Sequence, residues 1–160
     1  MSPQRIRDFL APLPVALIAG ALACFSPLDA SADDALDLDE YQGNVVVVDF
    51  WASWCVPCRR SFPWLNKMHA KYADDGLVII GINLDASKKD AAAFLEDYPA
   101  AFRIYYDTDA VYAKEFDIQA MPSSFVLGRD GEISARHLGF KVKRQQEYEA
   151  ILVEALGVGQ

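Results

Sequence analysis

The sequence VVVVDFWASWCVPC, residues 45–58, places two cysteines at the point where a predicted strand gives way to a predicted helix. The β-branched run that opens it is typical of a strand covered on both faces. After Cys58, apolar residues recur at three- and four-residue spacing as far as Tyr72, which indicates a helix. A helix N-terminus carries free N–H groups and about half a positive charge, so a thiol held there ionises more readily. Because the thiolate is the nucleophile, these residues indicate thiol–disulfide exchange.

Composition limits the class of protein. The 160 residues are enough for one domain with a substantial core. Hydrophobic residues make up 52% and charged residues 24%, which excludes an intrinsically disordered chain. The net charge of -8 argues against nucleic acid or an anionic membrane surface as a partner. Three cysteines, two of them in one CxxC motif, do not indicate a disulfide-stapled mini-fold.

Residues 1–32 have the pattern of an export signal. Arg5 and Arg7 supply a small basic region, and residues 9–28 contain no charged side chain. Ala30-Ser31-Ala32 then offers the small residues that a signal peptidase requires.

Cleavage after Ala32 would leave residues 33–160 as a single domain, periplasmic or otherwise exported and soluble. Two alternatives remain. Residues 9–28 are long enough for an uncleaved membrane anchor, and Cys24 would be the acylated residue of a lipoprotein. In each case the folded part lies outside the cytoplasm, where disulfides persist.

Strand-like and helix-like segments alternate along the rest of the chain. The expected strands are Val45–Phe50, Leu77–Leu84, Phe102–Tyr106, Ser124–Leu127 and Glu132–His137. The expected helices run from the CxxC motif to Tyr72, from Ala86-Ser87 to Tyr98, over Asp109–Phe116 and over Gln145–Leu156. This order predicts an α/β fold with a mainly parallel central sheet, helices on both faces and an antiparallel C-terminal hairpin.

With these elements in place, residues 48–59 resemble the active-site segment of the thioredoxin superfamily almost residue for residue. Pro63 matches the family's helix-kinking proline, and residues 121–125 resemble its cis-proline segment. Residues 45–156 share the resemblance, and the exported TlpA/ResA-like thiol-disulfide oxidoreductases are most similar. The resemblance implies a thioredoxin-like fold and a cis peptide bond before Pro122.

Several positions depart from that branch. Ser61 stands where a glutamate is usual, three residues after the second cysteine, and Asp49 stands where an asparagine is usual. Gly81 occupies the position of a lysine that thioredoxins carry near their buried aspartate. Residues 33–42 leave room for one short strand at most, whereas the branch usually opens with a hairpin.

The expected catalytic residues are Cys55, Cys58 and Asp49. Cys55 would attack a partner disulfide, and Cys58, one turn deeper, would resolve the mixed disulfide. Asp49 interrupts an apolar strand six residues before Cys55. A buried, unpaired carboxylate there would have a raised pKa and could exchange a proton with Cys58. The alternative is a solvated aspartate at the end of a strand.

The expected substrate-binding residues surround the two cysteines: Trp54, Val56, Pro57, Met121 and Pro122. Trp54 is either an apolar platform beside Cys55 or a core residue, whereas Trp51 is expected in the core. The Met121 backbone could pair with an extended client segment. Val56-Pro57 resembles the reducing branch of the superfamily.

The resemblance implies a reductase of disulfides in other exported proteins, for example in cytochrome c or copper-site maturation. Its only redox group would be the Cys55–Cys58 disulfide, with no cofactor or metal, and a membrane thiol-electron donor would reduce it again. The alternative is a Cu(I)-binding metallochaperone with His137 as third ligand. A zinc site lacks a second cysteine pair, and a c-type haem site would need histidine in place of Arg59.

Overall fold

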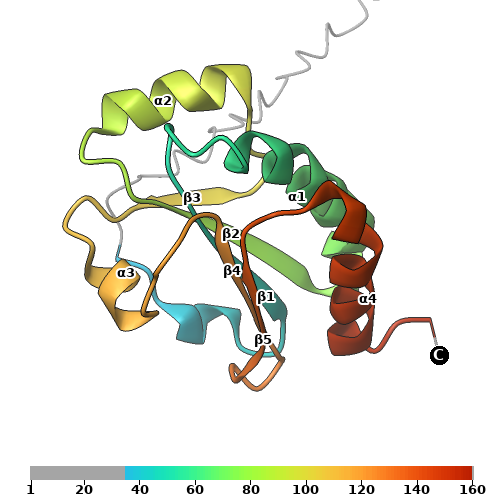
Figure 1. Ribbon diagram of the computed structural model, residues 1–160. Helices are drawn as coiled ribbons and strands as arrows, with labels where there is room; N and C mark the ends of the chain where they lie inside the picture. Colours follow the sequence, from blue (N-terminus) through green and yellow to red (C-terminus); the bar gives the residue numbers. More distant parts are fainter. Residues whose placement is uncertain (1–34, 160) are drawn as a thin grey trace, which may run out of the picture.

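The computed structural model describes residues 35–159 of the chain (Figure 1). Five strands form one sheet in the order β3-β2-β1-β4-β5. The strands are β1 (Val45–Trp51), β2 (Leu77–Asn83), β3 (Arg103–Tyr106), β4 (Ser123–Leu127) and β5 (Ile133–Leu138). The helices are α1 (Cys58–Tyr72), α2 (Lys88–Asp97), α3 (Val111–Glu115) and α4 (Gln145–Leu156), with short 3-10 helices η1 (Leu38–Tyr41), η2 (Ala73–Asp75) and η3 (Val142–Arg144).

Strand β1 lies at the centre of the sheet and is buried along its whole length. Its alternate side chains enter different cores, because successive residues of a strand point to opposite faces. Val45 and Val47 pack with residues of α1 and α4, whereas Val46 and Val48 pack with residues of β2, β4 and α3. The continuous β-branched run is therefore explained by helices on both faces, as the sequence predicts.

The predicted α/β fold class is confirmed, and the sheet is mixed. Strands β1, β2 and β3 are parallel, but β4 is antiparallel to β1 as well as to β5. The antiparallel part thus reaches the centre of the sheet. The segment that connects β3 to β4 begins and ends on the side of the sheet where the parallel strands finish, because Ser123 at the start of β4 pairs with Phe50 near the end of β1. A strand that starts where β1 ends can only run antiparallel to β1.

Two expectations concern the N-terminal part. The predicted signal peptide, residues 1–32, and Cys24 lie outside the described residues. Residues 38–41, within the segment with room for a short strand, form η1 instead, capped by Asp37. Within residues 35–159, none of the helices has the length and apolar character needed to cross a membrane.

Candidate active site

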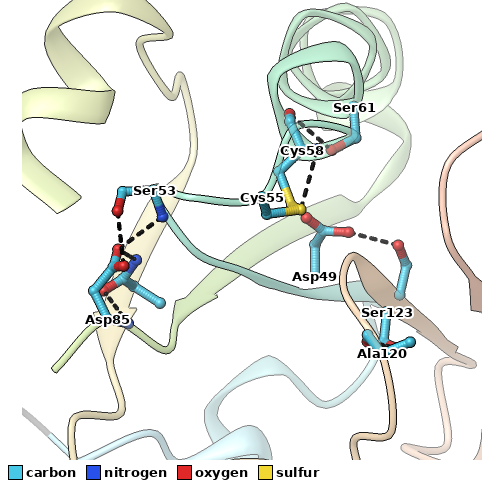
Figure 2. Close-up of a disulfide and its surroundings, with 10 residues drawn as sticks. Asp49, Ser53, Cys55, Cys58, Ser61, Asp85, Ala120 and Ser123 are labelled. Atoms are coloured by element: carbon cyan, nitrogen blue, oxygen red, sulfur yellow. Dashed lines mark hydrogen bonds between the residues drawn. A yellow bond between two sulfur atoms is a disulfide. The ribbon is translucent and has the colours of Figure 1, made fainter. Parts of the chain in front are cut away.

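Cys55 and Cys58 form a disulfide at the N-terminus of α1 (Figure 2), with an S–S distance of 2.00 Å and a Cα–Cα distance of 5.3 Å. The helix begins at Cys58, and Pro57 is its N-cap residue. The Cys58 backbone N–H donates a hydrogen bond of 3.3 Å to Cys55 Sγ. Cys55 is 4% exposed, whereas Cys58 has no exposed surface. The sulfur nearer the surface is therefore the one that the first helical amide contacts.

The loop before the disulfide is fixed to the neighbouring strand by Asp85. The Ser53 backbone N–H and hydroxyl donate hydrogen bonds of 2.9 and 2.8 Å to the two carboxylate oxygens of Asp85. The Asn83 side chain donates a third bond, of 2.7 Å, to the same carboxylate. Asp85 is buried and lies just beyond the end of β2. This network holds the chain that leads from β1 to Cys55.

Asp49 is fully buried, and its side chain points toward the disulfide (Figure 2). Ser124 Oγ donates a hydrogen bond of 2.5 Å to Asp49 Oδ1, while Oδ2 has no hydrogen-bond partner in the described residues. Its neighbour on β2 is Gly81, which supplies no charge. Burial raises the pKa of Asp49 from 3.8 to about 7, and the Ser124 hydrogen bond offsets only part of this rise. The alternative of a solvated aspartate is therefore wrong.

Aromatic side chains enclose the inner side of the disulfide. Cys55 and Cys58 belong to a buried cluster with Trp51, Phe62 and Phe94. The Trp51 ring centroid lies 4.9 Å from that of Phe62 and 4.8 Å from that of Phe94, which confirms its core position. These rings exclude water from the buried side of the site.

The outer side of the disulfide is apolar and open. Trp54 is 65% exposed and Val56 57%, so the core alternative for Trp54 is wrong. The Met121–Pro122 peptide bond is cis, as the resemblance implies, and Pro122 is buried. Met121 packs against the cluster that contains both cysteines. Among the described residues, neither its backbone N–H nor its C=O makes a hydrogen bond.

The structure does not bring His137 into a metal site with the cysteines. Within residues 35–159 there is no group of three or more His, Cys, Asp or Glu side chains that could hold a metal ion. His137 instead lies on β5, opposite Ser124, and packs against Tyr148, with 4.8 Å between the two ring centroids. The three-ligand arrangement of the copper alternative is therefore not present.

Sequence reasoning missed three residues of the site: Ser53, Asp85 and Ser124. A signal for Asp85 existed, because Asn83-Leu84-Asp85 places polar side chains at the end of the predicted buried strand Leu77–Leu84. Ser124 could not be found in this way, because its contact with Asp49 depends on the register between β1 and β4.

Known proteins resemble the chain in both sequence and structure. Residues 19–152 match the model of the Redoxin family. The thiol-disulfide oxidoreductase ResA of Bacillus thuringiensis is 28% identical over 112 residues, which cover 70% of this chain and 65% of ResA. The thioredoxin-like protein YneN of Bacillus subtilis is 31% identical over 113 residues, 69% of this chain and 65% of YneN. The chain thus spans just under two thirds of the length of these curated relatives.

A solved structure also matches. It is a Chlorobium tepidum protein provisionally named thiol:disulfide interchange protein DsbE, with a TM-score of 0.74 and 40% identity. The match covers 76% of this chain and 86% of that protein. Together with the sheet order and the CxxC motif at the start of α1, these matches identify the fold as thioredoxin-like. The chain belongs to the redoxin family.

Proposed function

We propose that this protein is an exported thiol-disulfide oxidoreductase that reduces disulfides in other exported proteins. The observation that carries the proposal is the contact between the first amide of α1 and Cys55 Sγ, 3.3 Å long, beside a buried carboxyl group. The names of the relatives ResA and DsbE support the same chemistry. The Cys55–Cys58 disulfide is the redox group, and no further cofactor enters the reaction.

In the first step the reduced protein attacks its client through Cys55. The Cys58 amide and the positive end of the helix dipole stabilise the thiolate on Cys55 Sγ. This thiolate forms a bond to one sulfur of the client disulfide, and the other client sulfur leaves as a thiolate. The exposed side chains of Trp54 and Val56 offer the client an apolar surface beside the reacting sulfur.

The second step resolves the mixed disulfide. Cys58 transfers its proton to Asp49, and the resulting thiolate attacks Cys55 Sγ. A new Cys55–Cys58 bond forms, and the second client sulfur leaves reduced. Asp49 suits this role because its pKa, about 7, lies near neutral pH, where a general base works best. Its Oδ2, without a partner in the described residues, is available to accept the proton.

Met121 is the second contact for the client. Its backbone N–H and C=O, which form no hydrogen bond within the described chain, lie on a loop whose side chain packs near both cysteines. An extended client segment can pair with these groups as an added strand. Pro122 and Pro57 shape the two loops that border this path.

Dithiothreitol-dependent reduction of insulin tests the activity. The wild-type protein should accelerate insulin reduction, and Cys55→Ser should abolish the acceleration. Cys58→Ser should retain the attack but accumulate a mixed disulfide. Equal rates with wild-type protein and with Cys55→Ser would refute the proposal.

The reduction potential tests the direction of transfer. We expect a reduction potential more negative than about −200 mV, measured by equilibration with glutathione buffers. Such a value lies on the reducing side of the range of known dithiol proteins. Pro57→His should make it less negative, because an imidazolium beside Cys55 stabilises the thiolate and hence the reduced form. A wild-type potential near −120 mV would instead make the protein an oxidant.

Export is supported by the basic, apolar and small-residue pattern of residues 1–32. The first residue of the protein recovered from the cell envelope tests it. Asp33 as that residue indicates cleavage after Ala32. Recovery of the intact chain from the membrane indicates an anchor, and recovery from the cytoplasm contradicts export.

A further inference from the structure

Three polar side chains form a row across the sheet on the face that α1 and α4 cover. Asp49 on β1 pairs with Ser124 on β4, and Ser124 pairs with His137 on β5. Residues directly opposite one another in antiparallel strands have Cβ atoms about 5 Å apart and share one face of the sheet. Asp49 and Ser124 are in direct contact, because Ser124 Oγ donates its 2.5 Å hydrogen bond to Asp49 Oδ1.

Ser124 and His137 both line a cavity. A space of about 20 Å³ is lined by Ser124 and His137, with apolar walls that include Trp64 and Tyr148. A cavity needs about 10–15 Å³ to hold one water molecule. His137 is half-buried, and its Nε2 is buried with no hydrogen-bond partner within residues 35–159. One water molecule therefore fits here and finds polar partners in the Ser124 hydroxyl and His137 Nε2.

We propose that Asp49, Ser124, one water molecule in this cavity and His137 form a proton relay that carries the proton of Cys58 to solvent. The proposal deepens the function proposed above and rests on it, because it gives Asp49 a route for the proton that it receives.

Cys58 loses its proton to Asp49, and the electron pair of the broken S–H bond stays on Cys58 Sγ for the attack on Cys55. The protonated carboxyl group of Asp49 turns about its Cβ–Cγ bond, which brings the proton received on Oδ2 to Ser124 Oγ. The Ser124 hydroxyl rotates toward the water molecule, accepts this proton and gives its own to the water. The water passes a proton to His137 Nε2, and the ring releases its Nδ1 proton to solvent, which leaves the imidazole as the Nε2–H tautomer. When the Cys55–Cys58 disulfide is reduced again and Cys58 regains a proton, the same transfers run in reverse and restore each member to its starting state. The client disulfide is the only oxidant.

The groups around His137 favour rapid release of the proton. Burial, followed by the positive charge of Arg144, lowers the pKa of His137, and Glu147 opposes this effect. Arg144 and Glu147 form an ion pair with each other where η3 meets α4. Tyr148 of α4 packs on the imidazole ring. A protonated His137 is therefore disfavoured and passes its charge outward.

The first test compares the two histidines of the chain, because each has a buried ring nitrogen without a partner in the described region. His137→Gln keeps a hydrogen-bonding side chain that cannot titrate, and His69→Gln on α1 is the matched control. The decay of the Cys55–glutathione mixed disulfide is followed by rapid quenching and mass spectrometry between pH 6 and 8. We expect His137→Gln to slow this decay about ten- to a hundredfold, near the lower end of general acid–base effects. His69→Gln should leave it unchanged.

The second test separates proton transfer from a structural role. Free imidazole should restore the decay rate of His137→Ala in proportion to its neutral form, because it can occupy the vacated space and carry the proton. Slower decay without rescue would overturn the relay and leave His137 a packing residue. Decay at the wild-type rate in His137→Gln would also overturn it, with the proposed function intact. If wild-type protein forms no mixed disulfide at all, the proposed function itself fails, and the relay with it.

Discussion

Asp85 accepts two hydrogen bonds from Ser53, one from the backbone N–H at 2.9 Å and one from the hydroxyl at 2.8 Å. The pair ties the end of β2 to the loop that carries Cys55. Because the Asn83 side chain donates to the same carboxylate, three donors depend on one buried group. The position of the reactive sulfur is thus set by a residue 30 positions away in the sequence.

Asp85→Ala should lower both stability and the rate of thiol exchange. The substitution leaves the half-buried donors of Ser53 and the buried amide of Asn83 without their acceptor, which costs about 2–3 kcal/mol. Urea unfolding and insulin reduction measure the two effects. Asp85→Asn keeps the shape of the side chain and part of its capacity to accept hydrogen bonds. Its stability and its rate of insulin reduction should therefore lie between those of wild type and Asp85→Ala. An Asp85→Ala variant with wild-type stability and rate would contradict a positioning role.

Asp49→Asn should make the protein more stable above pH 7. The folded-state pKa of Asp49, about 7, lies above the ordinary value of 3.8, so between these values the folded state holds a proton that the unfolded state has lost. Stability therefore falls as pH rises through this window, by up to about 4 kcal/mol at 1.36 kcal/mol per unit. The asparagine variant has no carboxyl group to ionise, so it does not lose this stability. Its free energy of unfolding should match that of wild type near pH 4.

Unfolding curves at pH 4, 6 and 8 measure the difference, with the exposed Asp74→Asn as a control that should change little. The same Asp49→Asn variant should resolve mixed disulfides more slowly, because no carboxylate remains to accept the Cys58 proton. Equal resolution rates in the two proteins would remove Asp49 from the mechanism.

Trp54→Ala should weaken client binding without affecting the fold. The side chain is 65% exposed, so its removal costs little core packing. We expect a higher KM for a protein substrate and an unchanged melting temperature. Val142→Ala, which removes another exposed apolar side chain from η3, is the control and should leave KM unchanged. A lower melting temperature for Trp54→Ala alone would indicate a structural role instead.

Gly81→Ala should destabilise the protein because the site has no space for a methyl group. A Cβ there would lie 2.7 Å from Ile104 Cδ1 and 3.2 Å from Trp51 Nε1. Overpacking of this kind typically costs about 1–3 kcal/mol. Ile104→Val removes the nearer atom, so the double variant should be more stable than the sum of the two single changes predicts. Strict additivity would show that Ile104 is not the obstacle.

Local patterns were sufficient for most of the fold. Gln145–Leu156 forms a helix with the predicted bounds, and the β-branched run at Val45 forms the central strand. Each of these segments repeats a pattern over several residues, and the pattern alone indicates its structure. The antiparallel direction of β4 was not predicted at the centre of the sheet, because it depends on where the connection from β3 ends.

The residues of the site also differ in whether a local pattern indicates them. Cys55, Cys58 and Asp49 stand within ten residues of one another, so a single strand-to-helix junction indicates all three. Ser124 and His137 reach Asp49 only through the pairing of three strands. A one-residue change in register would turn them to the opposite face, and no local pattern fixes that register.

Complete burial of Cys58 has a practical consequence. A client that collides with the protein meets Cys55 alone, so every covalent adduct forms at one sulfur and no dead-end adduct forms at the other. A chain with Cys58→Ser would keep the reactive sulfur but lose the means of release. Expressed in its own cell, it would act as covalent bait, and the proteins recovered with it would be its natural clients.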